Sequence, residues 1–167
     1  RDNSAGTRGG AIYARERSEL DIHSAHFSAN SAGEKGGAIS SRGAAQLHVV
    51  SSTFERNSSL GTSSDGSGGA ILIEDANDTY SQNLVISNSS FRGNTAFQSG
   101  GAIRFVADLS GVTAYIDYSE FVGNSANRGG GIEIYGSFSS DSDLYVNGAT
   151  LASNYAESAG GGVANLT

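Results

Sequence analysis

The 167-residue sequence contains no cysteine, proline, methionine or tryptophan. Without cysteine, the chain has no disulfide framework, no thiolate metal ligand and no cysteine nucleophile. The absence of proline is consistent with strands inside a sheet, because such strands need the N–H group that proline lacks. The sequence shows neither an initiating methionine nor a signal peptide, so we interpret residues 1–167 as one module of a longer extracellular protein.

Positive charge is also scarce. The chain has 10 Lys and Arg residues against 17 Asp and Glu residues, which gives a formal net charge of −7. This balance excludes a nucleic-acid partner, because no excess of positive charge is available to neutralise phosphates. No run approaches the ~20 apolar residues of a membrane span, so direct membrane insertion is excluded as well.

Two short motifs recur along the whole chain. The first is Gly-Gly-Ala-Ile, with Gly-Gly-Gly-Ile and Gly-Gly-Gly-Val as variants, at residues 9–12, 36–39, 68–71, 100–103, 129–132 and 160–163. The second is Phe-x-x-Asn at residues 27–30, 54–57, 91–94 and 121–124, with a Leu-x-x-Asn variant at 151–154. Its asparagines, with Asn3 included, are spaced 27, 27, 37, 30 and 30 residues apart. A period of this length indicates a repeat architecture.

Apolar residues two positions apart precede each Phe position and predict one face of a short strand. These pairs are Leu20/Ile22, Leu47/Val49, Leu84/Ile86, Ala114/Ile116 and Leu144/Val146. No repeat shows the three- and four-residue apolar spacing of a helix. Each repeat therefore predicts one coil of about three short strands, and coils stack to bury a shared core. The predicted fold is an all-β, right-handed parallel β-helix of about six coils of 27–37 residues.

Stacked coils place equivalent residues directly above one another, so the repeated positions predict ladders along the rod. One ladder is aromatic (Phe27, Phe54, Phe91, Phe121) and one is made of amides (Asn30, Asn57, Asn94, Asn124, Asn154). The paired glycines predict a corner that requires positive φ or close contact between coils. Arg104 with Glu133, and Glu55 with Arg92, are expected to form exposed ion pairs between coils. All these roles are structural.

The alternation of Gly-Gly-Ala-Ile with Phe-x-x-Asn resembles the repeat of the chlamydial polymorphic outer-membrane proteins, and related repeats occur in other surface proteins. The resemblance extends from Asn3 to Val163 and includes four strict copies of each motif. It implies the passenger domain of an autotransporter-type adhesin, secreted and displayed at the cell surface. The implied partner is a receptor or glycan on a host or neighbouring cell.

The segments that follow the glycine motif lengthen in the later coils and carry acidic residues. Long loops on one side of a solenoid often form its recognition surface. The candidate binding residues are accordingly Asp75, Asp78, Asp141 and Asp143. The sequence predicts no catalytic residue and no cofactor. It also predicts no metal site, because His23, His26 and His48 fall in three different columns of the repeat and are not expected to converge.

These observations favour a non-catalytic adhesive or structural module on the cell surface. Two alternatives remain open. Open strand edges could pair with further copies of the chain and build a filament. A parallel β-helix could also bind or degrade polysaccharides, in which case the loop aspartates would supply the carboxylates of a lyase or hydrolase.

Overall fold

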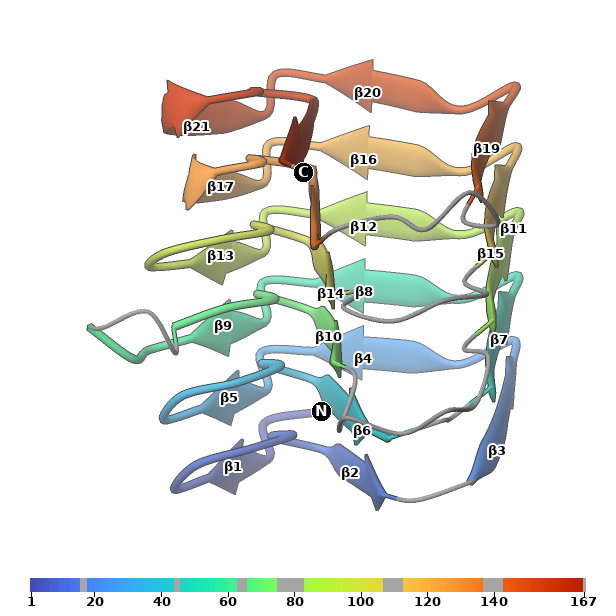
Figure 1. The fold of residues 1–167 in the computed structure, drawn as a ribbon. Coiled ribbons are helices and arrows are strands. Elements are labelled where there is room, and N and C mark those ends of the chain that lie inside the picture. Colours follow the sequence, from blue (N-terminus) through green and yellow to red (C-terminus); the bar gives the residue numbers. More distant parts are fainter. Residues whose placement is uncertain are drawn as a thin grey trace.

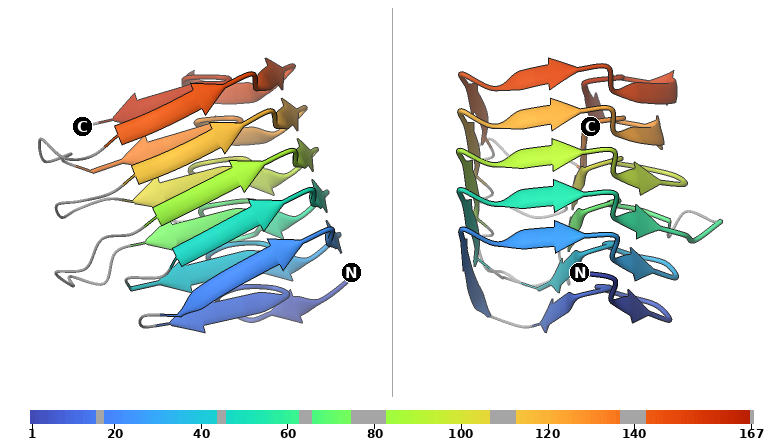
Figure 2. Two further views of the ribbon diagram at one scale, coloured as in Figure 1. Left: turned by 90° about the vertical axis from the view of Figure 1, so that its right-hand side faces the viewer. Right: turned by 180° about the vertical axis from the view of Figure 1, so that it is seen from behind.

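The computed structural model describes residues 1–15, 18–43, 46–62, 66–74, 83–106, 113–136 and 143–166. Within these ranges the chain forms four parallel sheets and no α-helix. No helix there is long and apolar enough to span a membrane. The chain winds in a right-handed sense from the N-terminal to the C-terminal end of a short rod (Figures 1 and 2). The predicted right-handed parallel β-helix is confirmed.

Each sheet takes one strand from every coil. Sheet A contains β1 (Ser4–Ala5), β5 (Ser31–Ala32), β9 (Ser58–Ser59), β13 (Thr95–Ala96), β17 (Ser125–Arg128) and β21 (Tyr155–Ala159). Sheet B contains β2 (Ile12–Arg15), β6 (Ile39–Arg42), β10 (Ile71–Glu74), β14 (Ile103–Val106), β18 (Ile132–Tyr135) and β22 (Val163–Leu166). Sheet C contains β3 (Glu19–His23), β7 (Gln46–Val50), β11 (Asn83–Ser87), β15 (Thr113–Asp117) and β19 (Asp143–Asn147). Sheet D contains β4 (His26–Ser28), β8 (Thr53–Glu55), β12 (Ser90–Arg92), β16 (Glu120–Val122) and β20 (Thr150–Ala152).

The coils differ from the prediction in number and in composition. Sheets A and B have six strands and sheets C and D have five, so the described chain makes five complete coils and the first half of a sixth. Each complete coil has four strands rather than three. The additional strand is the short one in sheet A, which has only two residues in the first four coils. A two-residue strand is too short to show an alternating apolar pattern.

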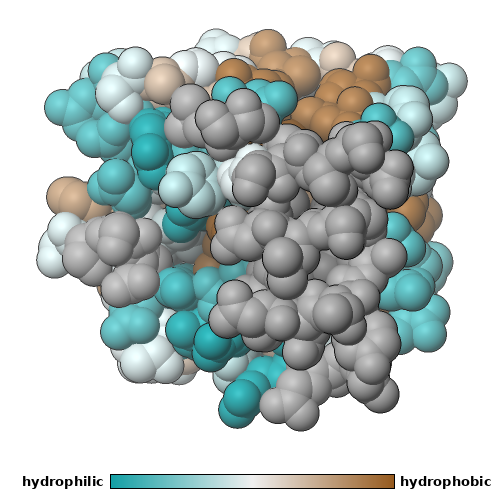
Figure 3. All heavy atoms as spheres, in the orientation of Figure 1, coloured by the Kyte–Doolittle hydropathy of each residue, from teal (hydrophilic) through white to brown (hydrophobic). Residues whose placement is uncertain are grey.

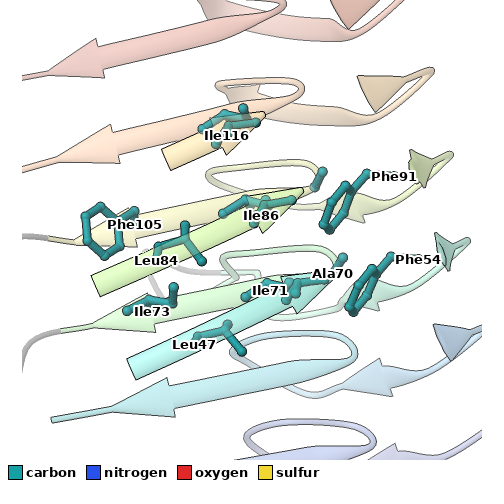
Figure 4. Close-up of a cluster of buried hydrophobic side chains, with 14 of the residues drawn as sticks. Leu47, Phe54, Ala70, Ile71, Ile73, Leu84, Ile86, Phe91, Phe105 and Ile116 are labelled. Atoms are coloured by element: carbon teal, nitrogen blue, oxygen red, sulfur yellow. The ribbon is translucent and has the colours of Figure 1, made fainter. Parts of the chain in front are cut away.

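The hydrophobic core lies between sheets B, C and D, where alternate residues of each strand point inward (Figure 4). The predicted phenylalanine ladder runs through it. The ring centroids of Phe27, Phe54, Phe91 and Phe121 are 4.8 Å apart at each step, and the rings are nearly parallel. Burial of each ring and its offset stacking on the next stabilise the coil-to-coil contact.

At the end of the rod that carries β19 and β20, apolar side chains are less completely covered. Leu144, Ala149 and Leu151 are only partly buried against the core, and Val146 is exposed. Figure 3 shows hydrophobic atoms gathered at this end, whereas much of the described flank is hydrophilic.

The asparagine ladder forms the corner between sheets D and A. Asn94 lies in its middle and is completely buried. Its Nδ2 donates to Oδ1 of Asn124 (3.0 Å) and to the carbonyl oxygen of Phe54 (3.0 Å), while its Oδ1 accepts from Nδ2 and the backbone N of Asn57 (2.9 and 3.0 Å). The amide thus satisfies backbone groups that a sharp inward corner would otherwise leave without partners.

A second polar ladder, which the sequence analysis did not identify, forms the corner between sheets C and D. The Oγ atoms of Ser52, Ser89 and Ser119 each accept a hydrogen bond from a backbone N of the preceding coil, at 3.1 Å. Each hydroxyl donates to the carbonyl oxygen two residues earlier, at 2.8–2.9 Å. The serines therefore bind backbone groups at the corner between sheets C and D, as the asparagines do at the corner between sheets D and A.

The paired glycines form the corner between sheets A and B, and their two positions have different requirements. The first glycine has positive φ, for example +66° at Gly68. A Cβ atom on the second, Gly69, would lie 2.0 Å from the carbonyl oxygen of Gly101 in the next coil. The first position needs a left-handed conformation and the second needs space, so both predicted reasons for glycine are confirmed.

Replacing Asn94 with alanine tests the amide ladder. We expect Asn94→Ala to lower the free energy of unfolding by about 3 kcal/mol or more, because several buried donors and acceptors lose their partners. Urea unfolding followed by circular dichroism measures the change. Asn3→Ala is the matched control, since Asn3 lies at the exposed end of the ladder and its side chain makes one hydrogen bond, to Asn30. Equal losses in both variants would contradict the proposed role of the buried amide.

Candidate functional site

Of the four predicted loop aspartates, one lies within the described residues. Asp75, Asp78 and Asp141 lie outside the described residues, whereas Asp143 begins β19 and is exposed. Tyr145 donates its hydroxyl to Oδ2 of Asp143 (3.2 Å). The negative charge of Asp143, followed by this hydrogen bond, raises the pKa of the Tyr145 hydroxyl above its ordinary value.

The outer face of sheet C carries an exposed aromatic pair. Tyr115 and Tyr145 occupy equivalent positions in neighbouring coils, with ring centroids 4.9 Å apart and an interplanar angle of 9°. Their exposed fractions are 42% and 47%, so both rings face solvent. Neither tyrosine belongs to the predicted apolar pairs, because each lies between two inward positions of its strand. Each tyrosine nevertheless precedes the first residue of its Phe-x-x-Asn or Leu-x-x-Asn motif by six residues, so an alignment of the repeats would have placed them in one column.

At the other end of the same face, Glu19, Asp21 and His48 form a polar cluster. One potential ligand atom from each residue lies within 4.8 Å of the other two. Nδ1 of His48 is 2.8 Å from Oδ1 of Asp21, and this hydrogen bond accounts for their proximity. Carboxylate and imidazole groups are ligands that divalent transition metals accept. The cluster joins His48 to two carboxylates, while His23 and His26 lie at other positions in β3 and β4.

The outer face of sheet B contains two networks centred on carboxylates, and the first surrounds Glu74. Its carboxylate accepts a hydrogen bond from Arg8 and one from Nζ of Lys35 (2.8 Å), and Nε of Arg42 lies 3.6 Å away. Burial alone would raise the pKa of Glu74. The hydrogen bonds and positive charges of Lys35 and Arg8 outweigh burial and lower the pKa below the ordinary value of 4.5.

The second network surrounds Glu133, whose exposed fraction is 0%. Nε of Arg104 lies 2.8 Å from Oε2, and Nε of Arg128 lies 3.0 Å from Oε1. Both guanidinium groups also approach the ring of Tyr135, at 5.5 and 6.0 Å from its centroid. The predicted pairing of Arg104 with Glu133 is correct, but its predicted exposure is wrong, because two arginine side chains cover the carboxylate.

The other predicted ion pair forms with different partners. Glu55 and Arg92 do face each other in the register of sheet D, as the sequence indicated. Arg92 instead pairs with Glu120 of the next coil, and Glu55 pairs with the adjacent Arg56. Exposed pairs of this kind contribute about 0–1 kcal/mol each, so the exchange of partners has little energetic consequence.

A shallow pocket of about 280 Å³ lies on the outer face of sheet A. It spans the last three strands of the sheet, β13, β17 and β21, which are stacked on one side of the rod (Figure 1). Its lining residues are Thr95, Ala96, Phe97, Ser125, Ala126, Asn127, Tyr155 and Glu157. None of these residues belongs to the predicted ladders or to the predicted binding residues.

Part of the chain matches a known protein family. The family described as Chlamydia polymorphic membrane protein (Chlamydia_PMP) repeat matches residues 1–15, 24–42 and 51–74. These three segments of the chain are thus similar to the repeat of this family. The later coils keep the same register, since Phe91 pairs with Phe54 and Ile103 pairs with Ile71. No curated protein and no solved structure matches the chain.

The Glu74 network makes stability depend on pH in a defined direction. A carboxylate whose pKa is lower in the folded state stabilises the fold above its unfolded pKa, and that contribution disappears as the pH falls through the folded value. We expect Glu74→Gln to destabilise the chain by about 1–3 kcal/mol at pH 7. The difference from the unchanged chain should narrow as the pH falls below 4.5, the ordinary value for this group.

Urea unfolding between pH 3 and pH 7 (about four pH units) measures this difference. Glu120→Gln is the control, because it removes an exposed carboxylate that also pairs with an arginine. It should show little effect at any pH. A Glu74→Gln difference that stays constant across the range would contradict the assigned network.

Proposed function

We propose that the chain is a non-catalytic, extracellular module that acts as an adhesin-like rod on the cell surface. The carrying observation is the exposed Tyr115–Tyr145 stack on an otherwise regular sheet. Aromatic side chains that face solvent in fixed positions are the residue type that anchors many protein interfaces. The polymorphic membrane protein repeats support surface display. The proposed partner is a receptor or glycan on a host or neighbouring cell.

The buried carboxylates support a structural rather than a catalytic role. Glu74 interacts with basic residues from β6 and from the segments before β2 and β6, and Glu133 interacts with Arg104 of the preceding coil. A polysaccharide hydrolase requires two carboxyl groups on either side of the scissile bond. Carboxylates that are already held by cations from neighbouring coils serve instead to join those coils.

Adhesion can be tested with beads that carry the purified 167-residue chain. We expect them to attach to cultured epithelial cells more strongly than albumin-coated beads, and soluble chain should compete. Tyr115→Ser combined with Tyr145→Ser should reduce attachment about tenfold, as expected when a central aromatic contact is removed. Tyr13→Ser is the matched control, because Tyr13 is a 42% exposed tyrosine on sheet B. Attachment no greater than that of albumin would overturn the proposal.

Two further assays separate the alternatives. Incubation with acidic polysaccharides and Ca²⁺, followed by detection of new unsaturated or reducing ends, tests for lyase or hydrolase activity. Electron microscopy of the purified chain distinguishes single short rods from end-to-end filaments. Product formation would replace the proposal with the enzyme alternative, and long stacks would replace it with the filament alternative.

A further inference from the structure

The pocket on sheet A exists because two aromatic residues depart from the repeat. Thr95, Ser125 and Tyr155 occupy one register position in three successive coils, so a tyrosine stands where the two earlier coils have small hydroxyl residues. Phe97 follows β13 in the earliest of these coils. The pocket thus has an aromatic residue in its first coil and another in its third, with Ser125 and Asn127 of the middle coil between them.

The coil spacing sets the width of this pocket. Neighbouring coils are 4.8 Å apart, as the stacked phenylalanine rings show. Two such steps separate the coils of Phe97 and Tyr155 by about 10 Å, which leaves room for one six-membered ring beside the aromatic side chains. The two residues are 54% and 65% exposed, so more than half of each is open to a ligand.

An irregularity in strand pairing brings polar groups to the same place. Ala126 pairs with Ala156 and Arg128 pairs with Ala159, so the single residue Asn127 faces both Glu157 and Ser158. Such a bulge redirects side chains locally and is over-represented beside functional sites. The hydroxyl of Ser158 lies 2.6 Å from Oδ1 of Asn127 and 3.0 Å from the backbone carbonyl oxygen of Asn127, and both oxygens accept from it. No described residue bonds the Nδ2 group of Asn127 or the carboxylate of Glu157.

These groups match the chemistry of a sugar ring. The C–H face of a pyranose packs against aromatic side chains, and its hydroxyl groups pair with an amide donor and a carboxylate acceptor. Small ligand sites commonly combine an apolar wall with a few polar groups in this way. Among the described residues that line the pocket, Glu157 is the one with a charged side chain, and it would repel sialic and uronic acids.

We infer that this pocket binds one neutral hexopyranose unit of a glycan. Phe97 and Tyr155 supply the aromatic contacts, and Asn127 and Glu157 bind hydroxyl groups. The inference rests on the proposed adhesive function and deepens it, because it names a class of partner and a second contact site. The site is separate from the tyrosine stack on sheet C.

Nuclear magnetic resonance of the ¹⁵N-labelled chain tests the inference, with N-acetyllactosamine and chitotriose as neutral probes and sialyllactose as the acidic probe. A neutral probe should produce saturable shifts at the amides of β13, β17 and β21. Sialyllactose should bind more weakly. Tyr155→Ala should weaken binding of the neutral probe about tenfold, a loss typical of removing one aromatic contact. Tyr13→Ala is the matched control, because Tyr13 is an exposed tyrosine on sheet B, and it should leave these shifts unchanged.

Three results would overturn the inference: no saturable shift with either neutral probe, shifts that survive Tyr155→Ala, or a preference for sialyllactose. Unfolding of the Tyr155→Ala variant would be visible in its spectrum, and Glu157→Gln, which removes only the charge, then serves as the second variant. Glu157→Gln should weaken binding of the neutral probe and should reduce the preference for neutral probes over sialyllactose. Unchanged binding of both probes would count against the site. Bead attachment distinguishes the two proposals, because adhesion without saccharide binding leaves the surface function intact.

Discussion

Each buried asparagine of the rod links its own coil to the coils before and after it, and the fold depends on these contacts. Asn94 donates to the following coil and accepts from the preceding one, while it also binds the carbonyl oxygen of Phe54. The strands of a parallel β-helix form their ladder bonds with neighbouring coils, so a coil removed from the stack would lose those bonds. The amide, serine and phenylalanine ladders act along the same axis and therefore reinforce one another.

The sequence predicted those parts of the fold that recur unchanged in every coil. Phe54 and Phe91 have the same environment, so selection for packing places the same residue at both positions. The serine corner was harder to recognise, because Ala25 and Ala149 replace serine in the first and last complete coils and serine is common throughout the chain. The two-residue strands of sheet A give no periodic signal, although their register is as regular as that of the longer strands.

The candidate sites were less predictable, for two physical reasons. An outward position on a strand does not guarantee exposure, and Glu133 is buried because arginine side chains from its own coil and the preceding one cover it. The pocket depends on Phe97 and Tyr155, each of which differs from its equivalents in other coils. A search for repeats emphasises what the coils share, whereas binding surfaces arise where one coil differs from the rest. A comparison of outward positions, column by column, could have revealed both aromatics.

The unequal repeat lengths of 27, 27, 37, 30 and 30 residues leave the register of sheets B, C and D intact, because the strands of these sheets keep their lengths from coil to coil. Sheet A departs from a regular register at the bulge between β17 and β21. A whole coil is consequently a unit that recombination can exchange, duplicate or delete without disturbing the fold of its neighbours. The scaffold tolerates such events as long as the new coil supplies its phenylalanine, its asparagine and its two glycines. Variation of the outward side chains and constancy of the residues along the axis are thus compatible within a single chain.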